Sequence, residues 1–195
     1  MSRLGNAVGM GLVAALLFSH GLAFSGEWGV EALMQELGKR GSGRASFTER
    51  KHVALLDKPI EQSGTLAFSP GRLEKFTRAP YLERMVVDGD FLMIESGSER
   101  RRRRLRLQRY PAIWGFIEGL RATLNGDLTT LRQFYEIELS GSDADWKLLM
   151  TPRPGEMAAV VNRISIRGVR GQVGFIEVLQ QGGDRSVMHI VESAT

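Results

Sequence analysis

Cysteine is absent from the 195-residue sequence, histidine occurs only three times, and no apolar run is long. Without cysteine there is no disulfide framework, no thiolate metal site, no catalytic thiol and no cysteine that an acyl chain could modify. The longest apolar segment, residues 12–18, is less than half as long as a membrane-spanning helix. We therefore expect the mature protein to be soluble and not to be a lipoprotein itself.

The N-terminal segment has the parts of a secretory signal peptide. Arg3 supplies a positive start, residues 12–18 supply an apolar centre, and small residues precede two cleavage sites, after Ala23 and after Ser25. We predict cleavage at one of these sites and localisation in the periplasm of a double-membrane bacterium. An uncleaved leader or a buried N-terminal helix is the alternative. Loss of residues 1–25 lowers the net charge from +4 to +3, which is only a weak indication of partners.

Two segments of the remaining chain, residues 26–195, have the apolar spacing of amphipathic helices. The first covers residues 30–39, where apolar residues recur at i, i+3, i+4 and i+7 before Gly41. The second covers residues 111–124 and has a proline in its first turn. About 170 residues after cleavage are enough for a single domain with one core.

Shorter segments separated by turn residues are predicted as strands, and Asp88-Gly89 is typical of a tight hairpin turn. The predicted strands lie near residues 45–55, 61–69, 72–79, 82–88, 91–95, 99–107, 133–139, 145–151, 161–167, 172–180 and 185–191. Short connections predict one antiparallel meander without a domain boundary. The expected fold is mainly β, with two or three helices against a strongly curved sheet.

The sequence contains no recognisable catalytic constellation. His52 and His189 lack the spacing of a metal site, and there is no nucleophile elbow or phosphate-binding loop. The carboxylate pairs Asp88/Asp90 and Asp143/Asp145 lie in predicted turns, where they have a structural use. We predict no enzymatic activity, no metal and no cofactor, and an envelope hydrolase is the disfavoured alternative.

Arginine is concentrated in the run Arg100–Arg104, which Arg106 and Arg109 extend. One interpretation is a solvated strand whose charges protect a sheet edge from aggregation. Another is attraction to anionic lipid head groups or to an acidic partner. Nucleic acid is not an expected partner, because aromatic residues are not interleaved with the arginines and export separates the protein from cellular nucleic acid.

Apolar residues are spread over nearly all of the predicted strands, and four methionines lie among them. These are Met85, Met93, Met150 and Met188. Flexible thioether side chains adapt to variable apolar shapes, although ordinary core packing also uses them.

Seven segments, in order, resemble the outer membrane lipoprotein carrier (LolA-like) family. They are residues 45–49 (ASFTE), 63–68 followed by Pro70 (SGTLAF), 72–76 (RLEKF), 85–92 (MVVDGDFL), 134–137 (FYEI), 146–152 (WKLLMTP) and 164–166 (ISI). The resemblance covers residues 30–192. It implies an incomplete β-barrel of about eleven antiparallel strands, with a helical lid over an apolar cavity that receives acyl chains.

The resemblance implies a monomeric, non-enzymatic carrier that shields the acyl chains of lipoproteins or other lipids between the two membranes. Its partners would be the acylated cargo, an inner-membrane donor, an outer-membrane acceptor and, transiently, the membrane surface. Residues 111–124 would belong to the lid. The candidate lipid-binding residues are Phe47, Leu66, Phe68, Phe76, Met85, Val87, Phe91, Met93, Trp114, Ile117, Leu120, Leu148, Met150, Ile164, Ile166 and Phe175.

Two departures from the family pattern affect the expected lid control and cargo. Ser69 stands where other members have an arginine that holds the lid closed, so Arg72 is the candidate substitute. Other members also continue into a further loop and strand, whereas this sequence ends at Thr195. The alternative function is an envelope protein-interaction module that uses the arginine-rich strand to bind an acidic partner.

Overall fold

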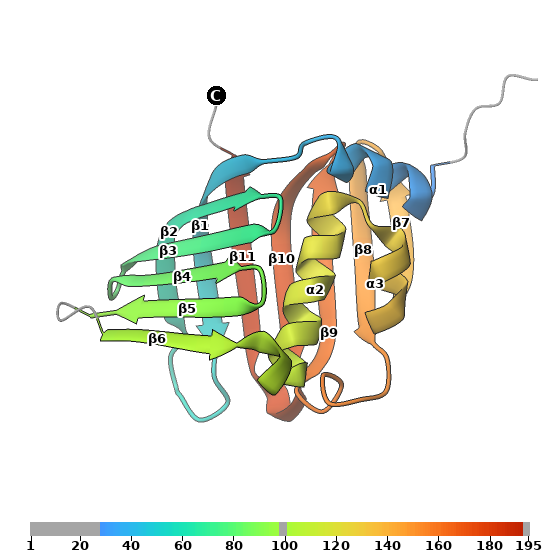
Figure 1. The fold of residues 1–195 in the computed structure, drawn as a ribbon. Coiled ribbons are helices and arrows are strands. Elements are labelled where there is room, and N and C mark those ends of the chain that lie inside the picture. The colour runs from blue at the N-terminus through green and yellow to red at the C-terminus, as the bar shows by residue number, and fades with distance from the viewer. Residues whose placement is uncertain (1–27, 98–100, 193–195) are drawn as a thin grey trace, which may run out of the picture.

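The computed structural model describes residues 28–97 and 101–192, so the predicted signal peptide and Arg100 lie outside the described residues. These residues form one antiparallel sheet and three α-helices (Figure 1). The helices are α1 (Val30–Gly38), α2 (Pro111–Asn125) and α3 (Leu128–Phe134), with short 3-10 turns η1 (Leu107–Arg109) and η2 (Gln181–Gly183). The strands are β1 (Gly43–His52), β2 (Ile60–Ser69), β3 (Arg72–Ala79), β4 (Glu83–Asp88), β5 (Phe91–Ser96), β6 (Arg101–Arg106), β7 (Tyr135–Ser142), β8 (Asp145–Pro152), β9 (Val161–Val169), β10 (Gln172–Gln180) and β11 (Arg185–Glu192).

The sheet has eleven strands in the order β6-β5-β4-β3-β2-β1-β11-β10-β9-β8-β7, and every neighbouring pair is antiparallel. In Figure 1, β3–β6 lie across the view and β8–β10 run up and down it, so the sheet is strongly curved. Its edge strands β6 and β7 do not pair, and the chain between them crosses the concave face as η1, α2 and α3. The predicted fold, an incomplete barrel with a helical lid, is confirmed.

The local signals account for most element boundaries. Pro111 occupies the first turn of α2, and Gly126 ends the helix in a left-handed conformation (φ 69°). The segment after Gly126 forms the short helix α3, because the Asp127 side chain accepts a hydrogen bond from the Thr130 amide at 2.9 Å. The following strand therefore begins at Tyr135 instead of the predicted residue 133.

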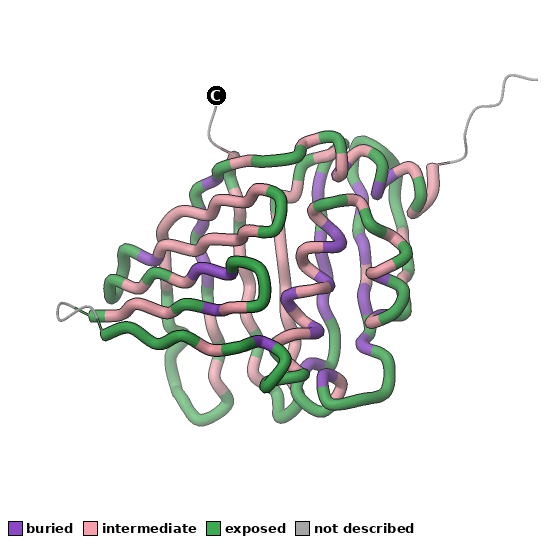
Figure 2. Tube along the Cα trace, viewed as in Figure 1, coloured by how far each residue is buried: buried purple, intermediate pink, exposed green. Residues whose placement is uncertain are grey.

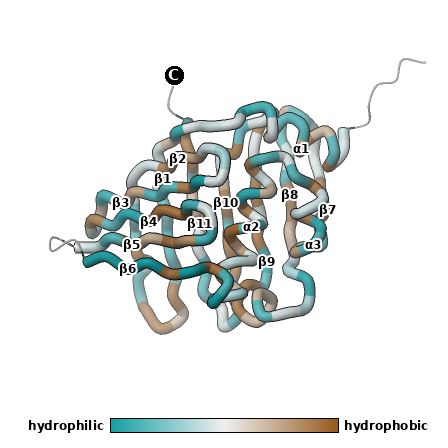
Figure 3. Tube along the Cα trace, in the orientation of Figure 1, coloured by the Kyte–Doolittle hydropathy of each residue, from teal (hydrophilic) through white to brown (hydrophobic). Residues whose placement is uncertain are grey.

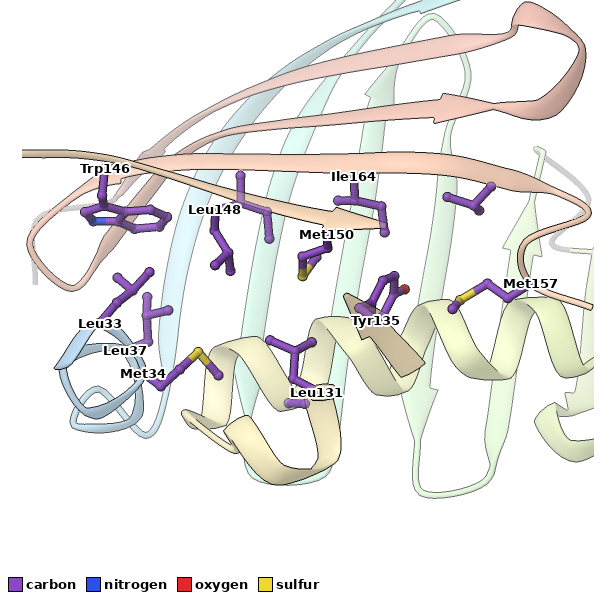
Figure 4. Packing of buried hydrophobic residues seen from close by; sticks show 13 residues of the cluster. Leu33, Met34, Leu37, Leu131, Tyr135, Trp146, Leu148, Met150, Met157 and Ile164 are labelled. Atoms are coloured by element: carbon purple, nitrogen blue, oxygen red, sulfur yellow. The ribbon is translucent and has the colours of Figure 1, made fainter. Parts of the chain in front are cut away.

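A tightly packed core lies where α1, α3 and the end of α2 cover β7–β10 (Figure 4). Figure 4 shows Trp146, Leu148 and Met150 of β8 pointing toward the helices. The buried members of this core are Leu33, Met34, Leu37, Ala122, Leu131, Tyr135, Trp146, Leu148, Met150, Met157, Val161, Ile164 and Ile166. This core holds the helical layer onto one side of the sheet.

A second, smaller core holds the other side of α2. It consists of Val87 of β4, Leu92 of β5, Leu107 of η1 and Ile117 of α2. Between the two cores, most residues of β2, β10 and β11 are only half-buried (Figure 2). Two separate cores therefore hold α2 against the two ends of the curved sheet, and the part of the sheet between these cores is incompletely covered.

Gly119 allows α2 to approach β7 closely. A Cβ atom built at Gly119 would lie 2.2 Å from Cε2 of Tyr135, which is fully buried. A glycine in a helix interior costs about 1 kcal/mol relative to alanine. Here the missing side chain gives room for the Tyr135 ring, so α2 and β7 pack in direct contact.

Arg121 ties α2 to the opposite side of the sheet. Its guanidinium donates to the carbonyl oxygens of Gly71 at 3.0 Å and Gly89 at 2.7 Å, and to the Glu118 carboxylate at 2.8 Å. Gly71 and Gly89 lie in the β2–β3 and β4–β5 turns, so one lid side chain spans two hairpins.

Arg72, the predicted lid-control residue, forms its ion pairs within the sheet instead. It contacts Asp88 at 2.7 Å and Glu74 at 3.5 Å, and its side chain is exposed. The lid-to-sheet arginine contact therefore comes from Arg121. Its acceptors are turn carbonyls, which leave no side-chain pattern in the sequence.

We expect Gly119→Ala to lower the free energy of unfolding by about 1 to 3 kcal/mol, because the added methyl group overpacks against Tyr135. Urea unfolding followed by circular dichroism measures this change. Gly115→Ala is the matched control on the same helix, because its Cβ would lie 3.1 Å from the flexible side chain of Met157. Greater stability of Gly119→Ala than of the wild type would contradict the close packing.

We expect Arg121→Ala to lower the free energy of unfolding by about 2 to 3 kcal/mol, because hydrogen bonds of a charged, poorly exposed donor are lost. Hydrogen exchange should quicken in α2 at the same time. Arg72→Ala removes only an exposed ion pair and should cost less than about 1 kcal/mol. An equal decrease in the free energy of unfolding of the two variants would show that Arg121 does not hold the lid more strongly than an exposed ion pair does.

Candidate functional site

A cavity of about 590 Å³ lies between α2 and the concave face of the sheet. Its volume is in the range of sites that bind small molecules, about 300 to 1,000 Å³. The apolar side chains that line it are Leu37, Ala45, Leu66, Ala67, Phe68, Leu73, Met85, Val87, Leu92, Ala112, Ile113, Phe116, Ile117, Leu120, Leu124, Met150, Val160, Val161, Ile164, Ile166, Val173, Ile176, Val178, Met188 and Ile190. The lining is predominantly hydrocarbon, which suits an apolar ligand.

Nine of the sixteen sequence-predicted residues line this cavity. They are Leu66, Phe68, Met85, Val87, Ile117, Leu120, Met150, Ile164 and Ile166. They come from β2, β4, α2, β8 and β9, so both halves of the sheet and the lid helix α2 contribute. Three of the four singled-out methionines also line it, because Met188 lies on the same concave side.

Three other predicted residues are used in packing next to the cavity. Phe47 is 2% exposed, with the Lys75 ammonium 4.8 Å from its ring centroid. Leu148 is fully buried in the larger core. Trp114 packs edge-to-face on Phe134, with 5.2 Å between the ring centroids. None of the three lines the cavity surface.

The remaining four predicted residues, Phe76, Phe91, Met93 and Phe175, alternate with cavity-lining neighbours and do not line the cavity. Neighbouring side chains of a strand point to opposite faces, so these four lie on the convex side. Each of the three aromatic rings has an arginine guanidinium over it, from Arg78, Arg104 and Arg167 respectively. Arginine thus shields apolar rings on the outer surface.

A register shift in β10 explains why Phe175 faces outward. It also explains why the sequence did not predict Ile176 and Val178 as cavity-lining residues. The pairing with β9 shifts between Val173 and Phe175, so one residue is added to the strand there. As a result Val173, Ile176 and Val178 all line the cavity. Strict alternation from Val173 would have placed Phe175 inside, and Gly174 is the only sequence signal of the shift.

A charged region of the cavity is formed by Glu49, Lys51, Lys75 and Ser186, and the further charged side chains Arg40, Arg44, Glu74 and Glu192 also line the cavity. Glu49 is 5% exposed, and its carboxylate accepts hydrogen bonds from the Lys75 ammonium and from the Ser186 hydroxyl, the latter at 2.5 Å. The Lys51 ammonium lies 3.8 Å from the same carboxylate. Buried charges are stable in a protein only when they are paired in this manner.

The charges in this region shift each other's pKa. Burial alone would raise the pKa of Glu49, but the Lys75 charge, with hydrogen bonds from Lys75 and Ser186, outweighs it and holds the pKa below its usual value. Burial lowers the pKa of Lys75, and Glu49 opposes that effect. The Lys75 ammonium and the Glu49 carboxylate lie in direct contact as an ion pair.

In residues 28–97 and 101–192, no group of three or more His, Asp or Glu side chains is arranged to hold a metal ion. Across the same ranges, none of the helices has the length and apolar character needed to cross a membrane.

Several solved structures are similar to this chain at low sequence identity. Solved structures similar to this chain include a LolA superfamily protein from Nitrosomonas europaea, with 8% identity, 83% of this chain and 90% of that chain covered, and a TM-score of 0.46. A domain named for outer membrane lipoprotein sorting, from Vibrio parahaemolyticus, has 8% identity, coverage of 83% and 89%, and a TM-score of 0.42. LprF from Mycobacterium bovis has 9% identity, coverage of 85% and 93%, and a TM-score of 0.34.

A search of curated proteins gives no match. The decisive comparison is with family models, because residues 25–194 match the model described as outer membrane lipoprotein carrier protein LolA-like. The match covers both cores, the lid and the whole sheet. The chain belongs to the LolA-like family of outer membrane lipoprotein carrier proteins.

Proposed function

We propose that this protein is a non-enzymatic periplasmic carrier that shields acyl chains during transport between the inner and outer membranes. The observation that carries the proposal is the cavity of about 590 Å³ beneath α2, whose lining is mostly aliphatic. Membership of the LolA-like family supports the same role. The cargo is an acylated molecule, either a lipoprotein or another lipid, and the protein acts as a monomer.

The energetics of burial fit reversible transport. Each buried methylene contributes about 0.8 kcal/mol, so five to ten of them give about 4 to 8 kcal/mol before the cost of opening the lid. Such a free energy holds cargo and still permits release. The inner-membrane donor and the outer-membrane acceptor need to supply only a modest difference in affinity.

Lid opening in this proposal is movement of α2 away from the β2–β3 and β4–β5 turns. Arg121 has hydrogen bonds to carbonyl oxygens in both turns, and these bonds break when an entering ligand pushes α2 away from the sheet. The contact between Gly119 and Tyr135 lies on the side of α2 that faces β7, and we propose that it stays in place when the lid opens. Arg72 is the lid-control residue predicted from the sequence, and we propose Arg121 for this role because its hydrogen bonds join α2 to the sheet.

We expect Ile190→Trp to weaken binding of a fluorescent fatty-acyl probe at least about tenfold, because the indole fills part of the cavity. Ile190 lines the cavity, whereas the next residue of β11, Val191, is 67% exposed. Val191→Trp is therefore the matched control and should leave the probe affinity unchanged. Circular dichroism of both variants verifies the fold.

Two results would count against the carrier proposal. One is a folded wild-type protein that binds no acyl probe. The other is an Ile190→Trp variant that binds the probe as tightly as the wild type, because the ligand would then lie outside this cavity.

The arginine-rich strand supports a second proposed function, docking to an acidic envelope partner. Residues 101–104 of β6 are all exposed at a free edge of the sheet, and β6 is strongly hydrophilic over this stretch (Figure 3). Arg104 lies over the Phe91 ring at 3.7 Å and Arg102 lies 3.5 Å from Glu95, so the strand is held in register. The same charges also suit protection of a free edge from aggregation.

Replacing Arg101, Arg102, Arg103 and Arg104 by glutamine distinguishes these uses of β6. If the strand docks a partner, a pull-down from an envelope extract should lose a specific protein while the fatty-acyl probe binds with unchanged affinity. An unchanged set of captured proteins, with faster aggregation of the variant, would reject docking and leave edge protection as the role.

A further inference from the structure

The charged region of the cavity has more cations than anions among its lining residues. Lys51 and Lys75 face one carboxylate, that of Glu49. Glu83 acts on Lys75 from outside the lining, and its influence is the weakest of the charges that act on this lysine. The lining at this point therefore has a surplus of about one positive charge beside an apolar hollow.

The Glu49 carboxylate is poorly accessible to a ligand. One of its oxygens accepts from Lys75 and the other from Ser186, and its side chain is only 5% exposed. A cationic head group would also meet the ammonium groups of Lys51 and Lys75 beside it. The region is consequently a poor site for a positively charged ligand.

The two lysines, in contrast, retain donors. An ammonium group has three N–H donors. Lys75 uses one on Glu49, and its next contact, the Gln62 side-chain oxygen, is 3.5 Å away. Lys51 is 39% exposed and lies 3.8 Å from Glu49, beyond hydrogen-bonding distance. Both ammonium groups can therefore donate to an anionic oxygen that enters the cavity.

We propose that Lys51 and Lys75 bind the carboxylate of a single-chain, fatty-acid-type ligand whose hydrocarbon chain lies in the cavity under α2. This inference rests on the proposed carrier function and names its ligand class. A carboxylate carries one negative charge, which equals the surplus at the site, whereas a phosphate monoester carries about 1.5 to 2. The apolar side chains of Val178, Ile176 and Met188 line the cavity next to this charged region, because Val178 pairs with Ser186 and Ile176 pairs with Met188. The hydrocarbon chain of the ligand would lie along them.

Isothermal titration of the full chain with ligands that share a twelve-carbon chain tests the head-group preference. The ligands are laurate, dodecanol, dodecylamine and dodecyl phosphate, each below its micelle concentration. We expect laurate to bind at least about tenfold more tightly than dodecanol, which is ~1.4 kcal/mol. Laurate should also bind more tightly than dodecylamine and dodecyl phosphate.

Variants then assign the preference to the lysines. Lys51→Met and Lys75→Met should each reduce laurate affinity toward that of dodecanol and leave dodecanol affinity unchanged. Because Lys75→Met leaves Glu49 buried without its main partner, the double variant Glu49→Gln/Lys75→Met provides a neutral pair and should show the same loss. Lys147→Met, at an exposed position of β8, is the control and should retain the preference.

The outcomes separate this inference from the carrier function. Equal affinity for laurate and dodecanol overturns the carboxylate site and leaves the carrier function standing. Tighter binding of dodecylamine or of dodecyl phosphate than of laurate also overturns it. Absence of binding by all four ligands contradicts the carrier function itself.

Discussion

Residues 107–134 carry the chain from one free edge of the sheet to the other, and this crossing constrains everything else in the structure. A curved sheet can bury its concave face by closing edge to edge, but here helices occupy the opening. The crossing helix α2 must pack against both halves of the sheet. It does so through two separate cores, one against β7–β10 and one against β4 and β5.

The cavity under α2 follows from that arrangement, because attachment of α2 at two points leaves the middle of the concave face uncovered. Aliphatic residues such as Ile176 and Ile190 remain half-buried there, with room for a hydrocarbon chain. The attachments differ in composition. On the β7 side Tyr135 packs closely against Gly119, whereas on the side of β4 and β5 the smaller core around Ile117 is combined with the Arg121 hydrogen bonds, which water can replace. We propose that α2 opens on this second side.

The sequence predicted the fold well where the signal is local and periodic. The strand alternation, the helices at residues 30–39 and 111–124, and the Asp88-Gly89 turn all correspond to observed elements. It predicted the site less completely, because lining a cavity depends on which face each residue occupies. The register shift at Gly174 turned Phe175 outward, the acceptors of Arg121 are backbone carbonyls, and Glu49 meets Lys75 from 26 residues away. Those relations exist only in the folded chain.

The proposed carrier function requires a hydrocarbon chain to lie under α2, on the concave face. Intermolecular nuclear Overhauser effects between a fatty acid and the isoleucine and valine methyl groups of the protein test it most directly. We expect contacts from the acyl chain to Ile166, Ile176 and Ile190, which line the cavity. Contacts to the exposed Val169 and Val191 in place of these, or none to any methyl group, would contradict it.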